Sequence, residues 1–111
     1  MVALEEIFVP EFESKAKDII NSIEDLNYRK RVDEEAKRIA WDAGQRFVFE
    51  DDIRYAERVI KAKNKINSIE DVKYKTLIED KSFEISRQKL HRYVFIEDVL
   101  EAEGYFQCCN N

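Results

Sequence analysis

The amino-acid sequence predicts an all-α fold of five helices, and three observations support this prediction. The chain has 111 residues with only two glycines and one proline, and it is rich in Glu, Lys, Ala and Ile, which favour helix. Apolar residues recur near the helical period of about 3.6 in the predicted segments. One stretch of the chain occurs twice, which indicates a tandem repeat of helical units.

The repeat has a constant offset of 46 residues. Residues 15–30 match residues 61–76 at ten of sixteen positions, and both copies contain Ile-Asn-Ser-Ile-Glu-Asp. Residues 46–57 match residues 92–103 at six of twelve positions. The offset predicts helices in the order A–B–A–B–A, where A and B are the two helix types of one repeat.

Apolar stripes and end signals place the five helices along the chain. The A helices are expected at about residues 5–20, 52–66 and 97–107, and the B helices at about 23–43 and 69–90. Pro10 falls inside the first A helix, so this helix either begins at Pro10 or is kinked there. Very short extended segments are expected near 47–49 and 93–95, directly before the second and third A helices.

The most similar part of the two copies is interpreted as a joint between an A helix and a B helix. Ser22 and Ser68 are predicted to be the N-caps of the B helices, and an acid three residues later completes a capping box in each copy. Gly44 is expected to end the first B helix, because glycine readily adopts the left-handed backbone found there. The repeated stretch is therefore assigned a structural role.

Residues 1–107 are predicted to form a single all-α domain. It contains two repeats, at about 2–47 and 48–93, followed by a third A-type helix at 94–107. Two packings fit this order: a stack of helical hairpins, as in helical-repeat proteins, or a histone-like arrangement with long central helices and short parallel extended pieces. Residues 108–111 are expected to be a frayed tail.

The stretch at 36–56 runs from the end of a B helix through a glycine, a basic residue and a short extended segment to an acid-capped helix start. The residues that carry this pattern are Gly44, Arg46, Val48, Asp52, Ile53 and Ala56. The pattern resembles the second half of the histone fold of archaeal histones and bacterial histone-fold proteins. The resemblance implies a DNA-associated protein with DNA contacts at Arg46 and, in a poorer copy of the pattern, at Arg92.

The charge of the chain restricts its partners. The net charge of −5 argues against an electrostatic nucleic-acid binder, because such proteins gain affinity by neutralising phosphates. It permits a basic protein partner. No apolar run approaches the roughly 18 residues of a membrane span and no signal peptide is evident, so a cytoplasmic protein without a membrane partner is expected.

No motif in the sequence points to catalysis, a cofactor or a metal. His91 is the single histidine and is expected to be a surface or cap residue. The frequent acidic pairs lack the Glu-x-x-His pattern of di-metal bundles and are typical of solvated helix faces with i,i+4 pairs. Cys108 and Cys109 are adjacent and form no disulfide framework, although an intermolecular disulfide or a metal-binding tail remains an alternative to two reduced thiols.

These observations lead to the hypothesis of a non-enzymatic, oligomeric protein-interaction module. Its surface is expected on the B helices, whose faces differ between the copies, and the candidate interaction residues are Trp41, Arg46, Tyr55, Phe83 and Arg92. The aromatic residues that flank the turns are expected to pack in the core; they are Phe47, Phe49, Tyr93 and Phe95. The alternatives are a histone-fold-like DNA-associated protein and an acidic inhibitor or nucleic-acid mimic that binds a basic protein surface.

Overall fold

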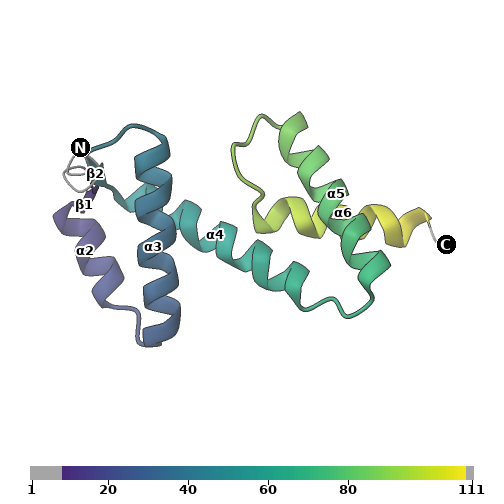
Figure 1. Ribbon diagram of the computed structural model, residues 1–111, viewed down its shortest axis with the longest axis horizontal. Coiled ribbons are helices and arrows are strands. Elements are labelled where there is room, and N and C mark those ends of the chain that lie inside the picture. Colours follow the sequence, from purple (N-terminus) through teal and green to yellow (C-terminus); the bar gives the residue numbers. More distant parts are fainter. Residues whose placement is uncertain (1–8, 110–111) are drawn as a thin grey trace, which may run out of the picture. The chain divides into compact units, whose positions relative to one another are not determined.

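The computed structural model describes residues 9–109, and this part of the chain is mostly helical, as the sequence predicts (Figure 1). Its elements in chain order are β1 (Glu11–Phe12), α2 (Ser14–Asn21), α3 (Leu26–Asp42), β2 (Phe47–Val48), α4 (Glu50–Asn67), α5 (Val72–Gln88) and α6 (Ile96–Cys109). The described part of the chain therefore holds five helices and two very short strands. The frayed tail predicted at 108–111 falls mainly outside it, although the backbone of α6 continues to Cys109.

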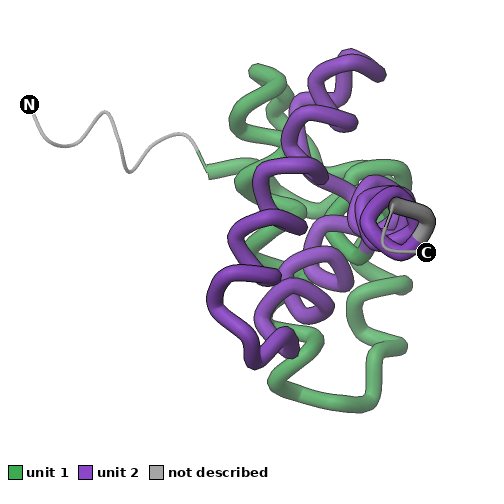
Figure 2. Tube along the Cα trace, turned by 90° about the vertical axis from the view of Figure 1, so that its right-hand side faces the viewer, with its two compact units in different colours: residues 1–57 green, residues 58–111 purple. Residues whose placement is uncertain are grey.

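The chain divides into two compact units, residues 1–57 and residues 58–111 (Figure 2). Helix α4 contributes to both, with residues 50–57 in unit 1 and residues 58–67 in unit 2. Each unit has a helical hairpin and a core of its own, and each is described separately below.

Unit 1 combines the hairpin of α2 and α3 with a small parallel sheet (Figure 1). Strand β1 pairs with β2 so that Glu11 faces Phe47 and Phe12 faces Val48. The N–H group of Glu11 donates to the carbonyl oxygen of Arg46 at 3.1 Å. The core under this sheet and between the helices includes Ala16, Val32, Ile39, Ile53 and Ala56.

Unit 2 packs the second half of α4 and the helices α5 and α6 around one apolar cluster. The buried members of this cluster are Ala62, Ile78, Ile85, Val99 and Ala102. Each of them lies 46 residues after one of the five buried unit 1 residues named above. These five positions of the 46-residue repeat are therefore buried in both units.

Aspartate side chains begin the B-type helices. Asp25 is the N-cap of α3, and its carboxylate accepts the N–H group of Tyr28 at 3.1 Å. Asp71 is the N-cap of α5, and its carboxylate accepts the N–H group of Tyr74 at the same distance. Both helices thus start three residues later than predicted, at Leu26 and Val72, because the cap is the residue whose side chain reaches the first free N–H groups.

The prediction that Ser22 and Ser68 are N-caps is wrong. Ser22 follows the end of α2 and donates its hydroxyl to the carbonyl oxygen of Ile19 at 2.6 Å. Ser68 does the same to Lys65 at 2.7 Å, at the end of α4. The serines therefore satisfy carbonyl groups at the end of one helix, which belong to the four carbonyls that a helix end leaves without internal partners.

The first A helix is also shorter than predicted. Residues 11 and 12 are extended in β1, and α2 begins only at Ser14, with Glu13 as its N-cap. Pro10 precedes the strand, where its missing N–H group costs no helical hydrogen bond. The part of the predicted helix that falls on residues 5–8 lies outside the described residues.

One of the two predicted extended segments forms a strand. Residues 47–48 form β2, whereas residues 93–95 lie in the loop between α5 and α6 without strand pairing. A strand needs a partner, and the position equivalent to β1 in the second copy, residues 57–58, lies inside helix α4. The two segments that the sequence predicted to be extended therefore differ, because only residues 47–48 are paired as a strand.

Candidate functional site

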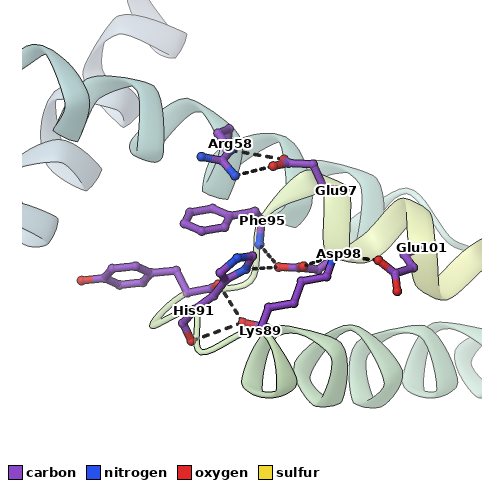
Figure 3. Close-up of polar contacts among 9 residues, drawn as sticks. Arg58, Lys89, His91, Phe95, Glu97, Asp98 and Glu101 are labelled. Carbon is purple, nitrogen blue, oxygen red and sulfur yellow. Dashed lines mark hydrogen bonds and ion pairs between the residues drawn. The ribbon is translucent and has the colours of Figure 1, made fainter.

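A polar cluster surrounds the start of α6 in unit 2 (Figure 3). At its centre the side chain of Asp98 is fully buried. Its Oδ2 accepts the N–H group of Phe95 at 2.9 Å and lies 3.2 Å from Nδ1 of His91. Asp98 therefore caps the first turn of α6 and ties the preceding loop to it.

Unit 1 has the same cap with a different partner. Asp52 lies 46 residues before Asp98, and its Oδ2 accepts the N–H group of Phe49 at 2.8 Å. The amide of Gln45 donates to the same oxygen at 2.8 Å. His91 occupies the position of Gln45, so Nδ1 of an imidazole makes the contact that an amide makes in unit 1.

The other carboxylate oxygen of Asp98 faces a cation. Its Oδ1 accepts no hydrogen bond from the described residues and lies 3.7 Å from Nζ of Lys89. The same ammonium group donates to Glu101 at 2.7 Å. This hydrogen bond, together with the charges of Glu101, Asp98 and Glu97, raises the pKa of Lys89 above its ordinary value. Lys89 is thus held over the buried carboxylate by an exposed ion pair.

The Phe95 ring is covered from two sides. The Arg58 guanidinium lies 4.2 Å from the ring centroid, and the His91 ring meets it edge-on at 4.9 Å. Arg58 also forms an ion pair with Glu97, and the hydrogen bonds of that pair lower the pKa of Glu97. As a result Phe95 is 6% exposed, whereas its equivalent Phe49 is 46% exposed.

The prediction that the aromatic residues at the turns pack in the core is therefore confirmed for Phe95 and wrong for Phe47 and Phe49, which are exposed. Tyr93 is half-buried. Arg58, which lies over the Phe95 ring, occupies the position that Phe12 has in unit 1. The surroundings of Phe95 and of its equivalent Phe49 therefore differ.

The contacts of this cluster are structural. The Ser86 hydroxyl donates to the carbonyl oxygen of Tyr93 at 2.8 Å, and its other contact is the carbonyl oxygen of His91 at 3.5 Å. The hydroxyl is thus engaged by backbone carbonyls, and the imidazole of His91 is engaged by Asp98. These contacts fasten the loop between α5 and α6 to both helices.

A second feature of unit 2 is the solvent-facing side of α5, with the neighbouring part of α6. Leu77, Phe83 and Tyr105 are exposed there to 48%, 56% and 47%. Two adjoining shallow hollows of about 470 and 460 Å³ lie beside them and share Asp80 and Glu84 in their linings. We call this region the α5 outer face, defined by Leu77, Asp80, Lys81, Phe83, Glu84, Arg87, Gln88 and Tyr105.

Charged groups flank the rings of the α5 outer face. The Lys81 ammonium lies 4.0 Å from the centroid of the Tyr105 ring and also pairs with Glu84 at 2.8 Å. The Arg87 guanidinium lies 5.6 Å from the centroid of Phe83. Apolar surface is thus bordered by both signs of charge, as at the core and rim of protein interfaces.

The apolar residues Leu77 and Phe83 of this face have no apolar equivalents in unit 1. Helix α3 is the equivalent of α5 in unit 1, and it carries Arg31 where α5 has Leu77 and Lys37 where α5 has Phe83. Both helices bury the same positions, for example Val32 in α3 and Ile78 in α5. Leu77 and Phe83 are therefore exposed apolar residues at positions where the equivalent helix carries charged residues.

The five residues predicted as interaction candidates are divided between the units. Trp41 at the end of α3, Arg46 in the loop before β2 and Tyr55 in α4 belong to unit 1, and all three are exposed. Phe83 and Arg92 belong to unit 2 and are also exposed, but only Phe83 lies on the α5 outer face.

Sequence reasoning missed two further residues of that face, Leu77 and Tyr105. Helical periodicity assigns Tyr105 to the apolar side of α6, and a single leucine gives no signal of exposure. A comparison of the two copies position by position finds Leu77, because its equivalent is the charged Arg31.

Within residues 9–109 no group of three or more His, Cys, Asp or Glu side chains is arranged to hold a metal ion. None of the helices in the described part of the chain is long and apolar enough to cross a membrane. Comparison with known proteins finds no matching family model, and no curated protein and no solved structure matches at a significant level. Function is therefore inferred from the side chains themselves.

Proposed function

We propose that this protein is a non-enzymatic, tandemly duplicated helical module that binds another protein chain through the α5 outer face. The observation that carries the proposal is the exposure of Leu77, Phe83 and Tyr105 on one side of unit 2. The equivalent helix of unit 1 has charged residues in place of the first two of these. Large apolar groups that solvent reaches are typical of interaction sites.

The duplication is supported by details that recur at the offset of 46 residues. Five buried core positions coincide in the two units, as do the aspartate caps at Asp25 and Asp71. Asp52 in α4 and Asp98 in α6 each accept the N–H group of the residue three positions earlier, at the start of their helix. Core and cap residues recur in the two copies, whereas surface residues differ. This combination suits a module that keeps its packing and varies its binding surface.

The composition of the α5 outer face suits tight contact at its centre. Burial of a phenylalanine side chain such as Phe83 contributes about 1.5–3 kcal/mol. Arginine is also among the residues enriched in the hot spots of protein interfaces. Phe83 and Arg87 stand next to each other here, and the remaining charges form the polar rim.

Site-specific photo-crosslinking tests the proposal. A photoreactive phenylalanine analogue is placed at Phe83, or at Leu26 as the control, in the cells that produce the protein. Leu26 is an exposed apolar residue at the start of α3 in unit 1 and is not one of the residues that define the α5 outer face. We expect protein adducts at position 83 that are weak or missing at position 26. Equal labelling at both positions, or no protein adduct at position 83, would overturn the proposal.

The identity of the adduct separates the variants of this function. A basic partner whose adduct yield falls as salt is raised supports an acidic inhibitor, since exposed charge pairs are screened by salt. A partner whose yield is insensitive to salt supports a contact dominated by the apolar side chains.

The parallel pairing of β1 with β2 favours a second candidate, the histone-fold-like DNA-associated protein. Arg46, which the resemblance to histone-fold proteins marks as a DNA contact, directly precedes β2 and is exposed. A gel-shift titration of duplex DNA at low salt tests this candidate. Retardation that weakens in Arg46→Glu supports it, and unretarded DNA excludes it.

A further inference from the structure

We infer that the occupant of the α5 outer face is a second copy of this chain, with the two α5 helices antiparallel about a two-fold axis near Phe83. The inference builds on the proposed function and names its partner. It follows from the order of charges along the helix, which makes the face complementary to itself.

Asp80 and Arg87 lie on either side of Phe83 along α5. They are seven residues apart, which separates them by about 10.5 Å along the helix axis and by only about 20° around it. Both are exposed, and both line the hollow that adjoins Phe83. Along one side of α5, an acid, an aromatic ring and a base therefore follow one another in the order Asp80, Phe83, Arg87.

A two-fold axis turns this stripe into matching contacts. In an interface of this symmetry, residue i of one copy meets residue j of the other, and j meets i. An antiparallel pairing centred near Phe83 sets Asp80 opposite Arg87 twice, with the two phenylalanine rings between these pairs. Carboxylate and guanidinium suit each other because both are planar and can form two parallel hydrogen bonds. A parallel pairing would instead set Asp80 against Asp80 and is disfavoured.

The balance of charge favours a self-complementary partner over a strongly charged one. The α5 outer face carries two acids, Asp80 and Glu84, and two bases, Lys81 and Arg87. A strongly basic partner would be attracted by the first pair and repelled by the second, and a strongly acidic partner would meet the reverse. A second α5 helix in antiparallel orientation places its Arg87 opposite Asp80 and its Asp80 opposite Arg87.

Charge-reversal variants test the inference through sedimentation equilibrium over a range of concentrations. We expect the wild-type chain to show a concentration-dependent dimer. Asp80→Lys and Arg87→Glu should each raise the dimer Kd by about tenfold or more, because each turns two attractive contacts into two repulsive ones. An equimolar mixture of the two variants should regain a dimer, because a heterodimer restores attraction at both contacts.

The mixing step separates loss of an interface from loss of folding, since a misfolded variant would not be rescued. Glu34→Lys is the matched control, because Glu34 is the equivalent of Asp80 on α3, and it should leave the dimer unchanged. A wild-type chain that stays monomeric at millimolar concentration overturns the inference. So does a dimer that is insensitive to both reversals, or a mixture that does not recover. A crosslink from position 83 to a different protein would in each case still support the proposed function.

Discussion

Gly44 and Leu90 lie 46 residues apart, and both adopt a left-handed backbone, with φ of 73° and 62°. Gly44 donates its N–H group to the carbonyl oxygen of Trp41, and Leu90 makes the equivalent bond to Arg87. Each therefore ends a B-type helix, as predicted for Gly44. One copy uses the residue that suits this conformation, and the other uses a leucine whose Cβ crowds the backbone.

Replacement of Leu90 by glycine is expected to stabilise unit 2. Leu90 is 91% exposed, so the change removes almost no packing. Relief of the left-handed strain should exceed the greater flexibility of glycine in the unfolded chain, for a net gain of about 0.5–1 kcal/mol. Thermal unfolding followed by circular dichroism should show a rise of a few degrees in Tm.

Gly44→Ala provides the opposite control. An added Cβ at Gly44 meets no atom within 4 Å, so the loss of about 1 kcal/mol expected there is conformational and involves no clash. A drop in Tm for Leu90→Gly would show that the side chain stabilises the fold in a way its exposure does not reveal.

His91 is expected to be replaceable by glutamine but not by leucine. Gln45 shows that a glutamine amide reaches the equivalent aspartate, so His91→Gln should keep the contact to Asp98 and change the free energy of unfolding by less than about 0.5 kcal/mol. His91→Leu removes a donor from a buried carboxylate and should cost about 1–3 kcal/mol. Urea unfolding at neutral pH measures both. Equal losses in the two variants would show that the imidazole ring packing on Phe95 matters more than the hydrogen bond.

The caps of α3 and α5 should be sensitive at aspartate and tolerant at serine. Asp25→Ala and Asp71→Ala each remove the acceptor for N–H groups of the first helical turn and should cost about 1 kcal/mol. Ser22→Ala removes a hydroxyl that donates to a carbonyl at an exposed helix end, where water can replace it, and should cost less than about 0.5 kcal/mol. Denaturant unfolding of the three variants gives the comparison. A larger loss at Ser22 than at Asp25 would contradict the cap assignment.

Tyr28 should ionise late in an alkaline titration. Burial and the neighbouring Glu57, which accepts a hydrogen bond from the phenol at 3.2 Å, raise the pKa of Tyr28 from 10.0 to about 12. The fold favours the neutral phenol, so this contribution to stability is complete below pH 10 and is lost as the pH rises through about 12. Ultraviolet absorbance of tyrosinate should show a late component that disappears in Tyr28→Phe.

Glu57→Gln refines this test. It removes the charge but leaves the burial, so the late component should move part of the way towards the ordinary value. Superimposable titrations of the wild-type chain and Tyr28→Phe would contradict the assignment.

Local sequence determined which segments are helical and where the 46-residue frame returns. Helix propensity and apolar period act within a few turns of the chain, so α3, α4, α5 and α6 could be predicted to within a few residues at most ends. The same reasoning marked Phe83 as a surface residue, because a lysine replaces it in the other copy.

Tertiary structure decided which residues pair as strands, which are buried and which are exposed. Residues 11 and 12 form a strand only because β2 lies beside them, and residues 93–95 form none because α4 occupies the place of a partner. The sequence predicted an acid at the start of α6, but the burial of Asp98 beside Lys89 and His91 depends on how the loop before α6 folds. Leu77 and Tyr105 are exposed because α5 and α6 turn other faces towards their common core. Pairing, burial and exposure depend on what meets a residue across space, and periodicity along the chain holds no information about that neighbour.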